Sequence, residues 1–129
     1  MSVPAELRYT EEHEWVGVLD GGKGRVGLTH HAQAQLGDIV FVQLPAVGQV
    51  LDSGQSMGHV ESVKSVTDIY APVSGKVVAV NAELDHSPEL VNEDPYGDGW
   101  LVEIEPTDAD EEWRVLLDAE KYQGLINGG

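Results

Sequence analysis

The stretch Glu61-Ser62-Val63-Lys64-Ser65-Val66-Thr67-Asp68 lies between two short segments that have the composition of β-strands. Lys64 is the only lysine or arginine between Arg25 and Lys76. Serine residues on both sides of a Val-Lys pair suit a solvated turn. The sequence therefore predicts a tight, exposed hairpin that presents one isolated amine.

A duplicated motif surrounds this hairpin. Residues 38–50 (DIVFVQLPAVGQV) and residues 65–77 (SVTDIYAPVSGKV) both close on Pro-x-x-Gly-(Gln/Lys)-Val, and Lys64 falls at the junction. Neither copy can bury a hydrophobic face alone, but two copies can do so by packing on each other. We expect a small antiparallel β sandwich with quasi-two-fold symmetry. A lone lysine on the turn between duplicated units is typical of a swinging-arm carrier, in which the amine anchors a cofactor.

The size and composition of the chain indicate one globular domain. Its 129 residues allow a single domain with a core and are too few for two. Hydrophobic residues make up 41% and charged residues 23%, an ordinary balance. We expect one domain over residues 1–129, with core repeats at about 38–63 and 65–105 and a C-terminal helical segment at about 107–124.

The charge and the missing residue types exclude several classes of function. The chain has no cysteine, so it has no disulfide, thiolate zinc site or cysteine nucleophile. The formal net charge of −16 repels nucleic acid and anionic membranes and favours partners with basic docking rims. There is no apolar run long enough to span a bilayer and no signal or transit pattern. We therefore expect a cytoplasmic protein.

Further elements are expected from local composition and capping signals. Strands are expected at residues 7–9, 13–19, 23–28 and 100–104. A helix should begin after Thr29 as N-cap and stop at Gly37. In an insertion at 85–95, Ser87 is expected to be an N-cap before Pro88. The acidic segment that starts at Asp108 is expected to open a helix that includes Trp113, Leu116 and Leu117. A second helical turn is expected at 120–123, followed by a frayed end.

Several separated blocks, in the right order, resemble the glycine cleavage system H-protein family. The Lys64 hairpin and the following Ala-Pro-Val-Ser-Gly75 are similar to the family's lipoylation segment. The family's acid three residues before the lysine and its glycine eleven residues after it are matched by Glu61 and Gly75. The other similar blocks are 9–15 (YTEEHEW), 26–33 (VGLTHHAQ), 36–45 (LGDIVFVQLP) and 92–100 (NEDPYGDGW).

The resemblance covers nearly the whole chain and implies a mainly β fold, the barrel-sandwich hybrid (lipoyl or hammerhead fold) of two quasi-symmetric small sheets. It implies lipoate amide-linked to Lys64, attached by a lipoate ligase or lipoyl transferase that recognises Glu61 and Gly75. It also implies a carrier without turnover of its own. Its partners would be a pyridoxal-phosphate-dependent glycine decarboxylase, a tetrahydrofolate-dependent aminomethyltransferase and dihydrolipoamide dehydrogenase.

The family also suggests that the loaded arm docks in a cleft on the carrier. Glu14 and Asp68 are the candidate partners of the cationic aminomethyl group, and the candidate apolar walls are Leu28, Ala32 and Leu36. Glu12 is a further candidate, although the family often has a small hydroxyl residue at that position.

Four alternatives remain at this stage. A lipoyl domain of a 2-oxoacid dehydrogenase commonly has Asp-Lys-Ala at the anchor, and a biotin carrier has Met-Lys-Met, whereas this chain has Val63-Lys64-Ser65. A small acidic enzyme could use the Glu12-His13-Glu14 segment, but no nucleophile, metal set or phosphate loop accompanies it. An unmodified β interaction module is the fourth. No metal site is expected, because adjacent histidines such as His30 and His31 do not share a helix face.

Overall fold

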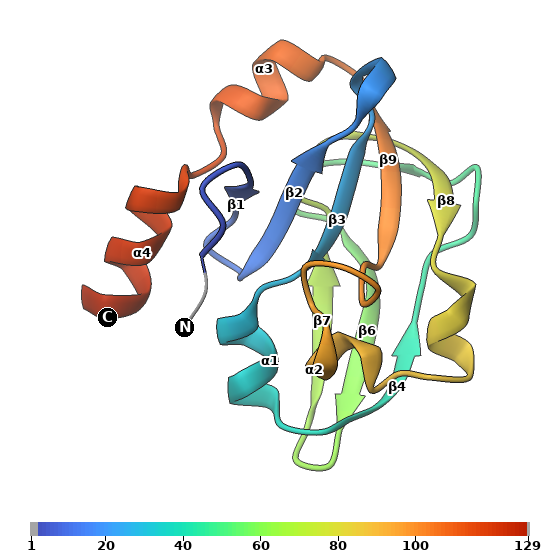
Figure 1. The fold of residues 1–129 in the computed structure, drawn as a ribbon. Coiled ribbons are helices and arrows are strands. Elements are labelled where there is room, and N and C mark those ends of the chain that lie inside the picture. The colour runs from blue at the N-terminus through green and yellow to red at the C-terminus, as the bar shows by residue number, and fades with distance from the viewer. Residues whose placement is uncertain (1–2, 129) are drawn as a thin grey trace.

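The computed structural model describes residues 3–128 and consists of two antiparallel sheets with short helices at their edges (Figure 1). The larger sheet has six strands in the order β1-β2-β3-β9-β8-β5, and the smaller has three in the order β4-β6-β7. The strands are β1 (Arg8–Tyr9), β2 (Glu14–Val18), β3 (Gly24–Leu28), β4 (Ile39–Gln43), β5 (Val50–Leu51), β6 (Ser56–Ser62), β7 (Val66–Tyr70), β8 (Gly75–Val80) and β9 (Val102–Pro106).

The two halves of the duplicated motif exchange strands. β5 belongs to the first repeat but pairs with β8 of the second, with Val50 opposite Lys76 and Leu51 opposite Gly75. β7 belongs to the second repeat but pairs with β6 of the first. The two Gly-(Gln/Lys)-Val corners therefore lie against each other, and the chain packs its repeats together as the duplication predicts. The mainly β, two-sheet fold predicted from the sequence is confirmed, but the sheets are unequal because β1, β2 and β3 extend one of them.

The register of β6 with its two neighbours separates an inner from an outer face. Val42 lies opposite Val60, and Val60 opposite Thr67. Val42 and Val60 are buried, whereas the next row, Phe41-Glu61-Val66, is more exposed. Since side chains alternate along a strand, this pairing sends Val42 and Val60 into the core and the next row toward solvent, while Thr67 on the edge strand is exposed.

Helix α1 (His30–Leu36) begins and ends at the residues that the sequence predicts. The Thr29 side chain accepts a hydrogen bond from the Ala32 N–H, and Gly37, with a φ of 81°, donates its N–H to the Gln33 carbonyl. The insertion at 85–95 stabilises the C-terminal end of this helix through Asn92. Asn92, in α2 (Leu90–Glu93), donates to the Gly37 carbonyl at 2.8 Å and accepts from the Ile39 N–H at 2.8 Å. The join between α1 and β4 is thereby fixed by one amide side chain.

Two C-terminal helices, α3 (Ala109–Arg114) and α4 (Ala119–Gly128), lie along the N-terminal strands (Figure 1). Trp113 packs so closely over Gly24 that a Cβ there would lie 2.6 Å from the indole ring. Tyr122 stacks on Tyr9 with ring centroids 4.6 Å apart, and both are fully buried. No helix within residues 3–128 is long and apolar enough to cross a bilayer.

The structure corrects several boundaries in the irregular segments. Ser87 is not an N-cap, because α2 begins only at Leu90 and is preceded by a turn, and a 3-10 helix (Ala82–Asp85) comes before it. Leu116 and Leu117 are not helical, since α3 ends at Arg114 and Leu117 forms a β-bridge with Tyr9. The C-terminal helix continues to Gly128 where fraying was expected. A second 3-10 turn (Asp20–Gly22) joins β2 to β3.

Alanine substitutions at two glycines should have opposite effects on stability, because one glycine contacts the neighbouring backbone and the other faces open space. A Cβ at Gly75 would lie 2.3 Å from the Glu105 carbonyl oxygen on β9, whereas a Cβ at Gly124 on α4 meets no atom within 4 Å. We expect Gly75→Ala to lower the free energy of unfolding by about 1–3 kcal/mol. Gly124→Ala should raise it by about 0.5–1 kcal/mol. Urea denaturation measures both, and an unchanged midpoint for Gly75→Ala would contradict the close β8–β9 approach.

Candidate functional site

The β6–β7 hairpin presents Lys64 at its turn. The Ser62 Oγ accepts hydrogen bonds from the backbone N–H groups of Lys64 and Ser65, each at 3.1 Å. The Ser62 N–H donates to the Ser65 carbonyl at 2.8 Å, and the Val63 N–H donates to the Asp38 carbonyl at 3.0 Å. The serines thus satisfy the backbone of the turn, as their turn chemistry predicts. Lys64 itself is exposed on a turn that its neighbours hold firmly.

The lysine side chain lies toward α1. A Cβ at Gly37 would be 3.2 Å from the Cε and 3.6 Å from the Nζ of Lys64. Since Gly37 ends α1, the amine lies beside the C-terminal end of that helix. The partial negative charge of a helix C-terminus stabilises a nearby cation.

Glu61 and Gly75, the two candidate recognition residues, lie in different surroundings. Glu61 is on β6, and its carboxylate lies 3.6 Å from Nε2 of His59. Gly75 begins β8 in the other sheet, pressed against the β9 backbone. Gly75 therefore does not shape the Lys64 hairpin. It is a position where close packing of β8 against β9 leaves no room for a side chain. Any effect on recognition would be indirect.

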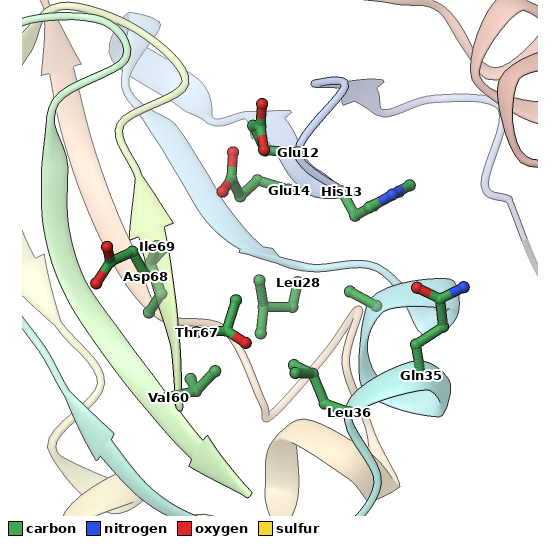
Figure 2. Close-up of a pocket in the computed structure, with 11 residues that line it drawn as sticks. Glu12, His13, Glu14, Leu28, Gln35, Leu36, Val60, Thr67, Asp68 and Ile69 are labelled. Carbon is green, nitrogen blue, oxygen red and sulfur yellow. The ribbon is translucent and has the colours of Figure 1, made fainter. Parts of the chain in front are cut away.

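A pocket of about 290 Å³ lies between α1, the N-terminal turn and β7 (Figure 2). The pocket is lined by all six residues that the sequence analysis proposed for arm docking from the family resemblance: Glu12, Glu14, Leu28, Ala32, Leu36 and Asp68. Figure 2 shows the acids of the N-terminal segment at one end and Leu28 and Leu36 in the middle. Segments far apart in the sequence thus form one cavity with apolar walls and two acids at one end.

Glu14 is the acid with the most unusual environment. It is 2% exposed, and each carboxylate oxygen accepts a hydrogen bond. The Thr10 hydroxyl donates at 2.8 Å and the Tyr70 N–H, on the edge strand β7, donates at 3.1 Å. Burial raises the pKa of Glu14 to about 7, although both hydrogen bonds oppose the rise. A carboxyl held in this way gains charge readily when a cation enters the pocket.

The other two acids are at the rim. Glu12 and Asp68 are exposed, so solvent screens their charges more than that of Glu14. The strand expected from residue 13 begins one residue later, because His13 has a φ of 70° and β2 begins at Glu14. The left-handed residue turns the chain at the mouth of the pocket.

Five lining residues were not predicted. Thr67 and Ile69 enter through the register of β7, and Val60 through β6. His13 and Gln35 lie at the end next to a second hollow, which is lined by Glu11, His31, Leu125 and Ile126 as well. The alternation of β7 was a signal for Thr67 and Ile69, but the contribution of His13 depends on a backbone angle that no local pattern specifies.

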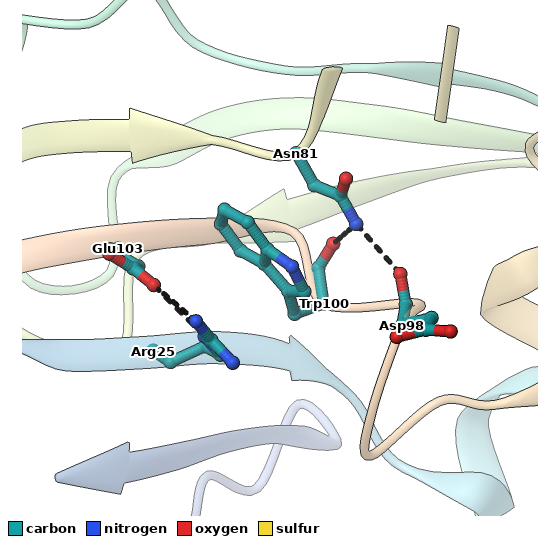
Figure 3. A network of polar contacts seen from close by, with 5 residues as sticks. All are labelled: Arg25, Asn81, Asp98, Trp100 and Glu103. Carbon is teal, nitrogen blue, oxygen red and sulfur yellow. Dashed lines mark hydrogen bonds and ion pairs between the residues drawn. The ribbon is translucent and has the colours of Figure 1, made fainter. Parts of the chain in front are cut away.

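A second polar network lies outside the pocket and supports the fold (Figure 3). Arg25 donates to the Glu103 carboxylate at 2.7 Å and lies 4.8 Å from the centre of the Trp100 ring. Asn81 donates to the Asp98 and Trp100 carbonyls, each at 2.8 Å. These contacts fix the loop before β9, so we assign the 92–100 block a structural role.

The titration of Glu14 tests this site directly. A raised folded pKa means that the folded state binds the proton more tightly, so stability from this group is fully present below the unfolded pKa of 4.5 and is lost as the pH rises through about 7. The loss at high pH is on the order of 3 kcal/mol, the equivalent of this pKa difference. We expect the Glu14 carboxyl to titrate by NMR near pH 7, and Glu14→Gln to remove this pH dependence. A midpoint below pH 5 would contradict the buried environment.

Comparison with known proteins gives a consistent result. The family model described as Glycine cleavage H-protein matches residues 7–128. A glycine cleavage system H protein of Mycobacterium sp. (strain KMS) is 58% identical, over 96% of each chain, and one of Bacillus cytotoxicus is 57% identical, over 98% of each. A crystal structure of such a protein from Mycobacterium marinum aligns with a TM-score of 0.87 at 43% identity, over 98% of this chain and 100% of the other. The chain belongs to the glycine cleavage H-protein family.

Proposed function

We propose that this protein is the lipoyl-lysine carrier of a glycine cleavage system, with lipoate attached to Lys64. The single observation that carries the proposal is the position of Lys64, an exposed amine on a firm hairpin beside a pocket that contains a buried carboxyl group. The family match over residues 7–128 supports it and does not favour a 2-oxoacid dehydrogenase domain. The chain then acts as a carrier component and performs no turnover of its own.

The residues present suit this cofactor. A lysine extended by a lipoyl group spans on the order of 14 Å, which allows its tip to reach beyond the hairpin into a neighbouring site. When attached, the dithiolane supplies the sulfur that carries the aminomethyl group, and the chain itself contains no cysteine that could do so. Attachment to one residue also raises the effective concentration of the reactive end wherever the carrier docks.

The pocket residues protect the cargo in this proposal. Leu28, Ala32 and Leu36 exclude water from the carried group, whose attachment is labile to hydrolysis. Glu14 attracts its ammonium, and the incoming positive charge holds Glu14 in the ionised form. Asp68 adds a weaker, exposed attraction. The oxidised arm lacks the positive charge and is held less firmly, so that the pocket discriminates by charge.

The partners follow from the same proposal. They are a pyridoxal-phosphate-dependent glycine decarboxylase, a tetrahydrofolate-dependent aminomethyltransferase, dihydrolipoamide dehydrogenase and a lipoate ligase or lipoyl transferase. A net charge of −16 favours basic docking rims on these enzymes. Recognition of Glu61 and Gly75 by the modifying enzyme, the single-domain organisation over residues 1–129 and a cytoplasmic location stay predictions.

Lys64 should be the only lysine that is modified. We expect intact mass after incubation with lipoic acid, ATP and a lipoate ligase to increase by one lipoyl group, and peptide mapping to place it on Lys64 and not on Lys23, Lys76 or Lys121. Lys64→Arg should abolish the increase and change the free energy of unfolding by less than about 0.5 kcal/mol, as for a surface change. A lipoyl group on another lysine would refute the assignment.

The pocket acids should slow the loss of the carried aminomethyl group to water. We expect Glu14→Gln to accelerate this loss about tenfold, because a hydrogen bond to a charged group contributes about 1.5–3 kcal/mol. Asp68→Asn should accelerate it about twofold, as for an exposed ion pair. Glu105→Gln, an exposed acid outside the pocket, is the matched control. Equal rates in all four proteins would show that the carboxylates do not hold the cargo.

A further inference from the structure

Tyr122 connects the C-terminal helix to the pocket. It lies on α4, is fully buried and stacks on Tyr9. Its hydroxyl is 2.8 Å from Nδ1 of His13 and 2.8 Å from Oγ1 of Thr29. One side chain near the C-terminus therefore contacts two segments that are 93 and 109 residues away in the sequence.

The two partners of this hydroxyl belong to two segments that meet beside the pocket. His13 lines the pocket and occupies the turn before β2. Thr29 is the N-cap of α1, the helix that contributes Ala32, Gln35 and Leu36 to the pocket lining. A backbone hydrogen bond already joins the two segments, from the Thr29 N–H to the His13 carbonyl at 3.0 Å. The Tyr122 hydroxyl adds the side-chain contact that orients the imidazole.

The three groups can form a chain of hydrogen bonds with one direction. Thr29 Oγ1 accepts from the Ala32 N–H and keeps its own hydroxyl proton. Either hydroxyl can donate in the Thr29–Tyr122 contact, and the role of Nδ1 depends on the His13 tautomer. We assign the direction in which Thr29 donates to Tyr122 and Tyr122 donates to Nδ1 of a neutral His13 that carries its proton on Nε2. Burial lowers the His13 pKa, and so does His31, whose ring lies 4.7 Å away, while Glu12 acts in the opposite direction.

The backbone conformation of His13 explains why contacts from other segments are needed to stabilise this turn. Its φ of 70° lies in the left-handed region, which costs a residue other than glycine about 1–2 kcal/mol. A turn in this conformation persists only where its surroundings determine it. The side chain of His13 is fixed by Tyr122 and packed against His31, and its other neighbouring groups are the Glu11 and Glu12 carboxylates.

We propose that Tyr122 is a positioning residue for the arm pocket: its hydroxyl connects His13 to the start of α1, and the C-terminal helix thereby maintains the shape of the pocket mouth that receives the loaded arm. The part of this inference that concerns the arm rests on the proposed carrier function. The part that concerns His13 does not, because the hydrogen-bond chain exists without the cofactor.

The variants distinguish the hydroxyl from the ring. Tyr122→Phe deletes the hydroxyl and keeps the stacking on Tyr9. Tyr9→Phe is the matched control, because it deletes a buried hydroxyl of the same cluster, one that donates to the Pro4 carbonyl and contacts neither His13 nor Thr29. Thr29→Ser keeps the oxygen that links the N-cap to Tyr122 and should behave as wild type.

The first measurement is the NMR titration of His13 in the unmodified protein. A hydrogen bond donated to the neutral imidazole stabilises the neutral form, so its loss raises the pKa. We expect a higher His13 pKa in Tyr122→Phe than in wild type, and no change in Tyr9→Phe or Thr29→Ser. An unchanged His13 pKa in Tyr122→Phe would overturn the directed chain, whether or not Lys64 carries lipoate.

The second measurement is the rate at which the loaded carrier loses its aminomethyl group to water. Lipoylation of every variant is first verified by mass, so that failure of attachment is distinguished from failure of the pocket. We expect about fivefold faster loss in Tyr122→Phe, the factor that corresponds to one ordinary hydrogen bond. Tyr9→Phe should match wild type. Equal acceleration by Tyr9→Phe and Tyr122→Phe would show that general loosening of the cluster, not the hydroxyl, is responsible.

Discussion

The pairing of β6 with both β4 and β7 is the constraint on which the site depends. β6 lies at the centre of the smaller sheet, so its register with both neighbours fixes which row of side chains enters the core. The same register places the turn between β6 and β7 at the end of that sheet, where Lys64 is exposed. It also leaves β7 as an edge strand, whose Tyr70 N–H is free to donate to Glu14. A shift of the β6–β7 register by one residue would displace both the Lys64 turn and the Tyr70 N–H that donates to Glu14.

The burial of Glu14 connects the fold to the proposed chemistry. An unpaired carboxylate in an apolar cavity is costly, and two hydrogen bonds offset only part of that cost, as the pKa of about 7 shows. In the proposed function, this environment suits the arrival of a positive charge without rearrangement of the site. The exposed Asp68 cannot provide this, because water screens its charge.

The sequence predicted the architecture well where local signals are strong, such as the packing of the two repeats on each other and the caps at Thr29 and Gly37, but it did not predict the exchange of strands between the repeats. It failed at Ser87, because Pro88 and the insertion form a turn before the helix. The six residues proposed for arm docking came from the family resemblance; they line one pocket, and their docking role stays a prediction. The left-handed backbone of His13 and the contact of Tyr122 with it were not predicted, since both depend on how distant segments pack.

The central claim is that a pre-formed pocket beside the Lys64 hairpin holds the charged end of the arm. A crystal structure of the protein carrying aminomethylated lipoyl-Lys64, determined at neutral pH, tests it most directly. The account predicts an ordered arm whose ammonium nitrogen lies within hydrogen-bond distance of the Glu14 carboxylate, about 2.7–3.2 Å. An arm extended into solvent, with the pocket filled by water and Glu14 still bonded to Thr10 and Tyr70 alone, would contradict it.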